Sequence, residues 1–281
     1  MAESHRGYAK GSGSMGHAKK VYETHEMLYQ RMKAEGIRSW EEFNAHNEHI
    51  NGVEVHMEHF MVGALAQPWA PSGGKAIEIG CGTGPIVRWL AERGFKCLGI
   101  DISKTAVAMA AEQSRGLGVS FRQADICNPV PAIPGKFALA VDGHCLHCIT
   151  GPDDRKAFLI GAHSLLRPGG LLLVSSMCRP IDRGRFAERN RERLIGSIVY
   201  ASWDGAGQFK HSRTIKGKPY APTRYIGHWK NILAEIKAAG FHPQLVRLSM
   251  HCAEDPISSL SVAALLGTTD ARASQAYRRC S

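Results

Sequence analysis

The chain has 281 residues, of which 44% are hydrophobic, 7% aromatic and 21% charged. This composition excludes a disordered, collagenous or coiled-coil protein, and the length allows one large α/β domain, alone or with a cap, to bury a core without disulfides. The formal net charge is +10, with +3 in residues 1–20 and +7 in residues 179–224. Such local basicity attracts anionic substrates or nucleic acid, and a solvated basic surface is the alternative.

Three features of the sequence bear on where the protein works. No apolar run approaches the ~20 residues of a membrane-spanning helix, so we do not expect an integral membrane protein or a membrane partner. Residues 1–20 lack the apolar core of ~7–15 residues that a secretory signal needs, and we interpret them as a flexible leader. The eight cysteines do not have the dense, regular spacing of a secreted disulfide framework, which favours a cytoplasmic setting.

The first elements after the leader are predicted to be helices. Apolar side chains near 3.6-residue spacing begin at Val21. Ser39 with Glu42 three residues later is typical of a capping box at the start of a second helix. A third helix is expected from Val53 to Leu65. We therefore expect residues 21–70 to form a helical lid.

After this lid the pattern changes to short strands and helices in alternation. Strands separated by helices of ~10–14 residues indicate right-handed βαβ units and a mostly parallel, doubly wound sheet. The alternation lapses between Arg179 and Arg224 and then resumes. The predicted strands are Lys75–Ile79, Lys96–Ile100, Val119–Gln123, Phe137–Val141, Gly170–Ser176, Pro243–Met250 and Ser258–Leu265, and the predicted helices are Pro85–Arg93, Ser103–Ser114, Asp153–Leu166 and Ile226–Ala239.

The most specific motif is a glycine-rich loop directly after the first of these strands. Gly80, Gly82 and Gly84 let backbone amides approach a ligand without side-chain obstruction, which indicates a nucleotide site. Their spacing departs from the Gly-x-Gly-x-x-Gly of dinucleotide sites, and the Gly-Lys-Ser/Thr ending of a P-loop is missing. Glu78, two residues before the first glycine, would repel a pyrophosphate and suits a cationic ligand.

With this loop the sequence resembles the class I S-adenosylmethionine-dependent methyltransferases, whose first motif is Glu/Asp-x-Gly-x-Gly-x-Gly. The resemblance covers about residues 75–265 and implies a seven-stranded, Rossmann-like sheet whose last strand is antiparallel. It also implies S-adenosylmethionine as the cofactor and S-adenosylhomocysteine as the product. The residues that match the family's cofactor-binding positions are Glu78, Gly80, Cys81, Gly82, Gly84, Asp101, Ile102, Ala124, Asp125, Ile126 and Asp142.

The resemblance implies separate roles for the residues at the strand ends. Asp101 stands where the family places the acid that binds the ribose hydroxyls, and Ile102 stands where an apolar side chain packs on the adenine. Asp125 stands where an acid accepts from the adenine amino group, and Asp142 closes the fourth strand. For any one of these acids the alternative is a carboxylate that caps the following helix.

The segment after the fourth strand supplies candidate catalytic residues. Histidine as a residue type titrates near neutrality, so the ring of His144 or of His147 can take a proton or orient an acceptor, with packing against the helix there as the alternative. The segment that begins at Asp142 departs from the Asn/Asp-Pro-Pro-Tyr signature of methyltransferases that modify DNA bases or protein amides. This difference counts against those substrates.

The same segment contains a Cys-x-x-Cys motif, Cys145 and Cys148. A structural zinc site needs a second pair at similar spacing, and the sequence has none, so no metal site is predicted. Convergence with Cys178 and Cys252 into a thiol-lined pocket for a metalloid acceptor is an alternative. Buried, inert cysteines are the favoured interpretation.

The acceptor pocket is expected between the helical lid and residues 179–224, because ligands of this fold lie outside the carboxyl ends of the strands. Arginine and aromatic side chains are interleaved there, and they can stack on a planar acceptor or bind RNA; a basic amphipathic helix is the structural alternative. The mixture comprises Arg183, Arg185, Arg189, Arg191, Arg193, Phe186, Tyr200, Trp203, Phe209 and Tyr220. The predicted acceptor-binding residues are Tyr22, Tyr200, Trp203, Arg224 and Tyr225.

These expectations divide the chain into a leader (1–20), a lid (21–70), the cofactor-binding half of the α/β domain (71–178), a substrate cap (179–224), and the C-terminal half of the domain with a tail (225–281). The predicted function is methyl transfer from S-adenosylmethionine to a nitrogen or oxygen of a small, planar or anionic molecule. An RNA methyltransferase and a non-catalytic cofactor-binding protein are the alternatives. The sequence leaves the acceptor's identity and the oligomeric state open.

Overall fold

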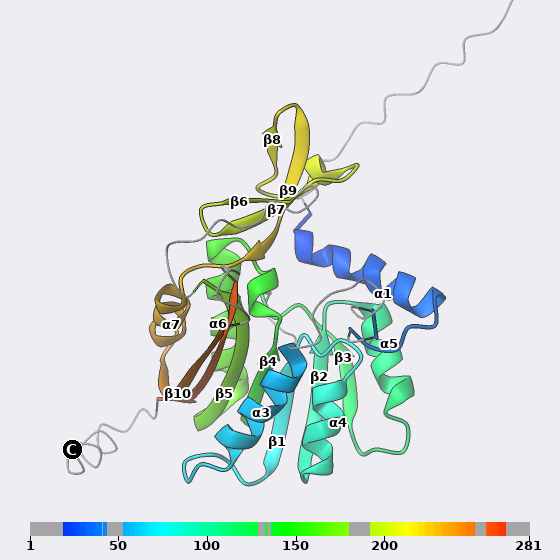
Figure 1. The fold of residues 1–281 in the computed structure, drawn as a ribbon. Coiled ribbons are helices and arrows are strands. Elements are labelled where there is room, and N and C mark those ends of the chain that lie inside the picture. The colour runs from blue at the N-terminus through cyan, green and yellow to red at the C-terminus, as the bar shows by residue number, and fades with distance from the viewer. Residues whose placement is uncertain are drawn as a thin grey trace, which may run out of the picture.

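The computed structural model describes residues 19–40, 42–43, 53–128, 133, 136–179, 192–250 and 257–267. These residues form a large sheet with helices on both faces and a smaller sheet placed above one end of it (Figure 1). None of the helices in these ranges is both long and apolar enough to cross a membrane.

The large sheet has seven strands in the order β10-β11-β5-β4-β1-β2-β3. Strand β11 runs antiparallel to both of its neighbours, and the other pairs are parallel. The predicted seven-stranded sheet with an antiparallel last strand is therefore confirmed. The strands are β1 (Gly74–Ile79), β2 (Phe95–Asp101), β3 (Ser120–Gln123), β4 (Phe137–Gly143), β5 (Leu166–Cys178), β10 (Phe241–Met250) and β11 (Ser258–Leu266).

Burial of the central strands on both faces explains their continuous apolar sequence. Successive side chains of a strand point to opposite faces, so a strand covered on both sides is apolar at every position. In β4, Leu139 and Val141 belong to the core on one face, and Ala140 belongs to the core on the other. In β5, Leu173 likewise packs in the core on the first face and Leu172 in the core on the other.

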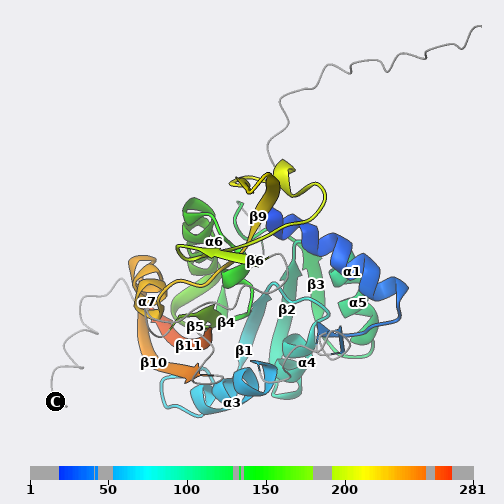
Figure 2. The same cartoon turned by 45° about the horizontal axis from the view of Figure 1, so that its top comes forward.

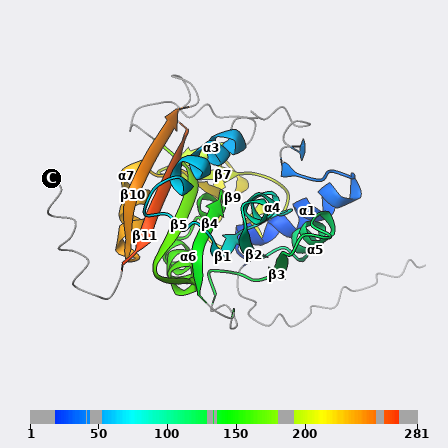
Figure 3. The same ribbon diagram turned by 90° about the horizontal axis from the view of Figure 1, so that it is seen from below.

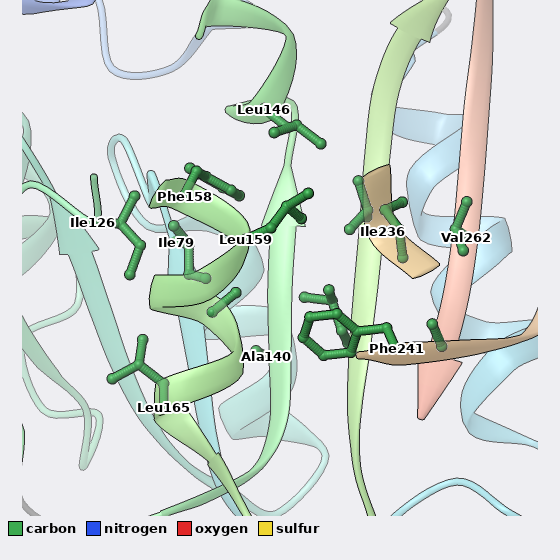
Figure 4. Packing of buried hydrophobic residues seen from close by; sticks show 14 of the residues in the cluster. Ile79, Ile126, Ala140, Leu146, Phe158, Leu159, Leu165, Ile236, Phe241 and Val262 are labelled. Atoms are coloured by element: carbon green, nitrogen blue, oxygen red, sulfur yellow. The ribbon is translucent and has the colours of Figure 1, made fainter. Parts of the chain in front are cut away.

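Helices α3 and α4 cover one face of the sheet, and α6 and α7 cover the other (Figure 3). Figure 4 shows Phe158 and Leu159 of α6 and Ile236 of α7 directed toward β4 and β5. Helix α5 packs beside β2 and β3 and is capped by Ser103, whose side chain accepts from the Ala106 amide. The helices are α3 (Val53–Leu65), α4 (Pro85–Glu92), α5 (Lys104–Gln113), α6 (Pro152–Leu165) and α7 (Trp229–Ala238).

The helical region before β1 is divided between two places. The 3₁₀ turn η1 (Val21–Thr24) and helix α1 (His25–Ala34) lie across the carboxyl ends of the strands (Figures 1 and 2), whereas α3 packs on a face of the sheet. Of the predicted capping box, the Ser39 hydroxyl accepts from the Glu42 amide at 3.2 Å, whereas the Glu42 side chain accepts from the Arg38 amide and not from that of Ser39.

The region where the alternation of strands and helices lapses contains the smaller sheet, which we call the cap sheet. Its four antiparallel strands have the order β6-β7-β9-β8 and comprise β6 (Glu192–Ile195), β7 (Ile198–Ala201), β8 (Arg213–Ile215) and β9 (Lys218–Tyr225). The amphipathic-helix alternative is wrong for residues 192–225. Three of the strands have only three or four residues, which is too short for a period of two to stand out in the sequence.

Candidate functional site

The glycine loop connects β1 to α4 at the carboxyl end of the sheet. The φ angles of Gly80, Gly82 and Gly84 are 70°, 51° and 80°, a region that L-residues rarely adopt. The Gly80 amide donates to the Ile100 carbonyl at 2.8 Å, and the Gly82 amide donates to Asp101 Oδ2 at 2.9 Å. The loop is thus held against the end of β2.

Neighbouring atoms occupy the space that side chains would need at these glycines. A Cβ on Gly80 would lie 2.7 Å from Cys145 Cβ, and a Cβ on Gly82 would lie 2.6 Å from the hydroxyl oxygen of Tyr29. Both contacts are too short for any Cβ. Glycine is therefore required at both positions by conformation and by space.

Three carboxylates are buried around this loop. Glu78 Oε2 accepts from the Val87 amide at 3.0 Å, and Asp101 Oδ1 accepts from the Ser103 amide at 2.8 Å. Asp142 is fully buried and accepts from the amides of Cys145 and Leu146. Burial raises the pKa of each carboxyl group and brings that of Asp142 to about 7.

A cationic ligand fits this environment. Within the part of the chain that the structure describes, Glu78, Asp101 and Asp142 form no ion pair within 4 Å. Their hydrogen bonds from backbone amides leave lone pairs on the carboxylate oxygens for further donors. A positive group at the glycine loop would lower the free energy of these buried charges, and ribose hydroxyls could donate to Asp101.

Asp125 follows β3, which lies on the other side of β1 from β4 in the sheet order. Its Oδ1 accepts from the Cys127 amide at 2.9 Å, and its Oδ2 accepts from Asn128 at 2.7 Å and from the Tyr22 hydroxyl at 3.3 Å. Ala124 and Ile102 are partly buried against the core of the sheet, together with the fully packed Ile126.

Helix α1 closes the site from above. Glu26 accepts from the Ser103 hydroxyl at 2.6 Å and from the Thr105 hydroxyl at 2.5 Å, which fixes α1 to the first turn of α5. Tyr29 is buried over Gly82 and accepts from Trp40 Nε1 at 2.6 Å. The lid is thus attached to the loop and to α5 by polar contacts.

The predicted catalytic histidines lie on the segment after β4, around the 3₁₀ turn η2 (Leu146–Cys148). Their ring centroids are 5.8 Å apart. His144 has a φ of 80°, and its Nε2 lies 3.5 Å from the Ser175 hydroxyl. His147 is buried, and its Nδ1 has no hydrogen-bond partner among the described residues.

A cavity of about 390 Å³ lies between the η2–α6 connection and the cap sheet. The guanidinium of Arg213 lies 5.4 Å from the centre of the Tyr200 ring, so the wall combines a positive charge with an aromatic face. The lining residues are Thr150, Gly151, Pro152, Ile198, Tyr200, His211, Ser212, Arg213 and Pro222.

Comparison with known proteins agrees with this geometry. Residues 76–170 match the family model described as a methyltransferase domain. A ubiquinone biosynthesis O-methyltransferase of Methylococcus capsulatus is 29% identical over 143 residues, which are 50% of this chain and 59% of that protein. The match therefore spans less than two thirds of that relative's length.

Solved structures show the same fold at low sequence identity. An S-adenosylmethionine-dependent methyltransferase from Clostridium acetobutylicum superposes with a TM-score of 0.54 and 15% identity, over 74% of this chain and 90% of that one. The DhpI–SAH complex also gives a TM-score of 0.54 and 15% identity, over 88% and 97% of the two chains. Residues 76–170 thus match a methyltransferase domain, and the described residues have the fold of these S-adenosylmethionine-dependent methyltransferases.

The other predicted acceptor-binding residues are distributed around the cap sheet. Trp203 packs on Phe209, with ring centroids 5.6 Å apart. The Tyr225 ring lies under the guanidinium of Arg155 at 3.9 Å, and the charge of Arg224 acts on His25 and Cys148. Arg183, Arg185, Phe186, Arg189 and Arg191 lie outside the described residues, as does Cys252.

Several residues of the site carried no signal in the sequence. Glu26 and Tyr29 reach the site only because α1 folds back over the loops that follow β1 and β2. The buried Arg155 lies between the charged residues Asp154 and Lys156, where the sequence suggests an exposed position. Among the described residues no group of three or more His, Cys, Asp or Glu side chains has a geometry that could hold a metal ion.

Replacing Gly80 by alanine is expected to weaken cofactor binding and to destabilise the fold more than a matched replacement elsewhere. Left-handed strain costs about 1–2 kcal/mol, and the clash with Cys145 adds about 1–3 kcal/mol. Gly94→Ala is the control, since Gly94 has a φ of 84° with open space around it. Urea unfolding of both variants measures the difference. Equal destabilisation would contradict the packing argument.

Proposed function

We propose that the protein transfers the methyl group of S-adenosylmethionine to an oxygen or nitrogen of a small, planar or anionic molecule. The observation that carries this proposal is the cavity between the η2–α6 connection and the cap sheet, with Arg213 and Tyr200 in its wall. An arginine beside an aromatic ring suits an acceptor with a flat ring and a negative charge. The matched relatives are named as O-methyltransferases, which favours oxygen.

The chemistry requires little beyond positioning and removal of a proton. S-adenosylmethionine supplies an electrophilic methyl group for an in-line displacement, and the protein contributes by holding the two reactants close together. Asp101 and Asp125 are proposed to bind the ribose and the adenine. A hydroxyl acceptor must also lose a proton, and the unpartnered Nδ1 of His147 can take it, with His144 as the second candidate.

The experiment that tests this function is a screen of small-molecule pools with isotopically labelled methyl donor, read by mass spectrometry. We expect the label in a small phenolic or carboxylate-bearing acceptor and S-adenosylhomocysteine as the second product. Tight binding of the cofactor without transfer to any acceptor would favour the non-catalytic alternative.

An RNA acceptor is tested by a salt titration. Binding to single-stranded RNA falls with salt at a slope of about −0.7 per neutralised phosphate. Two of the described arginines act within the protein: Arg213 lies near Tyr200, and Arg224 acts on His25 and Cys148. We therefore expect no RNA binding at ~150 mM salt. Tight, steeply salt-dependent binding would overturn the small-molecule proposal.

Once an acceptor is known, Arg213→Ala is expected to raise its KM by about tenfold. A hydrogen bond to a charged group contributes about 1.5–3 kcal/mol, and solvent exposure of Arg213 reduces this to the lower end. Lys218→Ala is the matched control, because it removes an exposed charge from the same hairpin outside the cavity. Steady-state kinetics with both variants give the comparison, and equal KM values would contradict this assignment of the cavity.

A further inference from the structure

The Cys-x-x-Cys motif lies at the edge of the site, and the proposed methyl transfer uses neither thiol. Cys145 and Cys148 are both free and half-buried. The Cys148 amide donates to the Cys145 carbonyl at 2.9 Å, so the two residues close a single turn. Residues related in this way have Cα atoms less than ~7 Å apart, which overlaps the ~4.4–6.8 Å range of disulfides.

A guanidinium and two imidazole rings, from three elements, act on Cys148. Burial alone would raise the pKa of the thiol, but the charges of Arg224 on β9 and of His147, with hydrogen bonds from His147 and from His25 on α1, hold it well below its usual range. Burial opposes the charged form of His25 too, yet its contact with Cys148 raises the pKa of the ring. The two shifts favour the thiolate of Cys148 and the charged form of His25, and a thiolate is the nucleophilic form of cysteine.

Acidic groups also act on Cys148 without reversing the direction of its pKa shift. Asp101 on β2 and Asp142 on β4 both interact electrostatically with Cys148, as does the Tyr29 hydroxyl of α1. The thiol of Cys148, when protonated, donates to the carbonyl oxygen of His144, 3.7 Å away.

Cys145 has the opposite character. Burial and the nearby Asp142 carboxylate raise the pKa of its thiol well above the usual value, so it stays protonated. A Cβ on Gly80 would lie 2.7 Å from the Cβ and 2.8 Å from the Sγ of Cys145, so Cys145 packs directly on the glycine loop. The pair thus combines one reactive thiolate with one protonated thiol in contact with the cofactor loop.

From this juxtaposition we propose that Cys148 and Cys145 form a redox-active dithiol, which hydrogen peroxide converts into a disulfide beside the cofactor loop. The Cys148 thiolate attacks the peroxide, so that an S–O bond forms, the O–O bond breaks, and the leaving hydroxide takes a proton from the imidazolium. Cys145 then attacks the sulfenic sulfur, so that the S–S bond forms, the S–O bond breaks, and a second water leaves with the Cys145 proton. Oxidation shifts Cys145 against Gly80 and removes the counter-charge of His25 and Arg224, which weakens cofactor binding.

The oxidation is tested on the full-length protein with hydrogen peroxide, blocking of remaining thiols, and trypsin digestion. Cleavage after Lys136 and Arg155 releases residues 137–155, which contain Cys145 and Cys148 as their only cysteines. We expect this peptide to lose two hydrogen atoms and to regain them with dithiothreitol. A peptide that stays fully reduced, or that stops at sulfenic or sulfinic acid on Cys148, would overturn the proposed pair.

Variants and a second readout separate the two thiols. In Cys145→Ser we expect a sulfenic acid on Cys148 that reacts with dimedone, and in Cys148→Ser no oxidation of Cys145. At pH 6, iodoacetamide should label Cys148 at least tenfold faster than the buried Cys97, whose pKa is raised to about 12 by burial. His25→Asn should slow this labelling several-fold. Equal labelling of Cys148 and Cys97 would refute the thiolate assignment.

The link to the cofactor is measured by calorimetry with S-adenosylhomocysteine. The oxidised protein should bind it at least tenfold more weakly than the reduced protein, with recovery after dithiothreitol. Unchanged affinity in protein shown by mass to contain the disulfide would refute the coupling. None of these experiments requires methyl transfer. A result against the dithiol proposal is therefore distinct from a result against the proposed methyltransferase function.

Discussion

Replacing Asp101 by alanine is expected to weaken S-adenosylmethionine binding by about 2–4 kcal/mol, which is roughly 30-fold to several hundred-fold in affinity. In this assignment the buried carboxylate accepts hydrogen bonds from the ribose hydroxyls. Hydrogen bonds to an ionised group are stronger than those between neutral groups. Asp101 also accepts from the Gly82 and Ser103 amides, so its loss loosens the loop that holds the ligand. Calorimetric titration with S-adenosylmethionine measures the change.

Two controls separate binding from folding in this experiment. Glu112→Ala removes an exposed acid from the neighbouring α5 and should leave the affinity unchanged. Thermal unfolding shows whether Asp101→Ala is folded at the temperature of the titration. A folded Asp101→Ala protein with wild-type affinity would refute the placement of the ribose at this carboxylate.

Arg155→Ala is expected to lower the free energy of unfolding by about 2–4 kcal/mol, because it leaves the carbonyls of Leu146 and Ile149 without this donor and breaks an ion pair whose Glu235 side chain is 33% exposed. The Arg155 side chain is only 2% exposed. Its Nη1 donates to the carbonyls of Leu146 and Ile149 at 2.8 and 3.2 Å, and its Nη2 pairs with Glu235 at 2.5 Å. The same side chain therefore fixes η2, packs on the cap sheet through Tyr225, and joins α6 to α7.

Urea unfolding of Arg155→Ala beside Lys156→Ala gives the measurement. Lys156 is the next residue of α6 and is exposed, so its truncation should change the free energy of unfolding by less than about 0.5 kcal/mol. Arg155→Lys is expected to fall between the two, since an ammonium group cannot reproduce the planar fork that spans Glu235 and the two carbonyls. Equal stability of the Arg155→Ala and Lys156→Ala proteins would contradict this role.

The sequence by itself determined the α/β architecture of this protein and the position of its cofactor loop. Both follow from local information. The apolar runs of β4 and β5 are buried on two faces, Ser103 caps the helix after β2, and the glycines of the loop have conformations that other residues rarely adopt. Each of these signals lies within a few residues of the structure that it specifies, so it can be recognised without knowledge of what packs against it.

Only the tertiary structure decided which distant side chains complete the site. Glu26 reaches Ser103 and Thr105 across more than seventy residues of chain, and Arg224 and His25 meet at Cys148 from the cap sheet and the lid. No local sequence pattern predicts such contacts, because they depend on how α1 and the cap sheet fold over the carboxyl ends of the strands. The strands of the cap sheet were not predicted from the sequence for a related reason. They are short, and their stability comes from pairing with one another and not from local propensity.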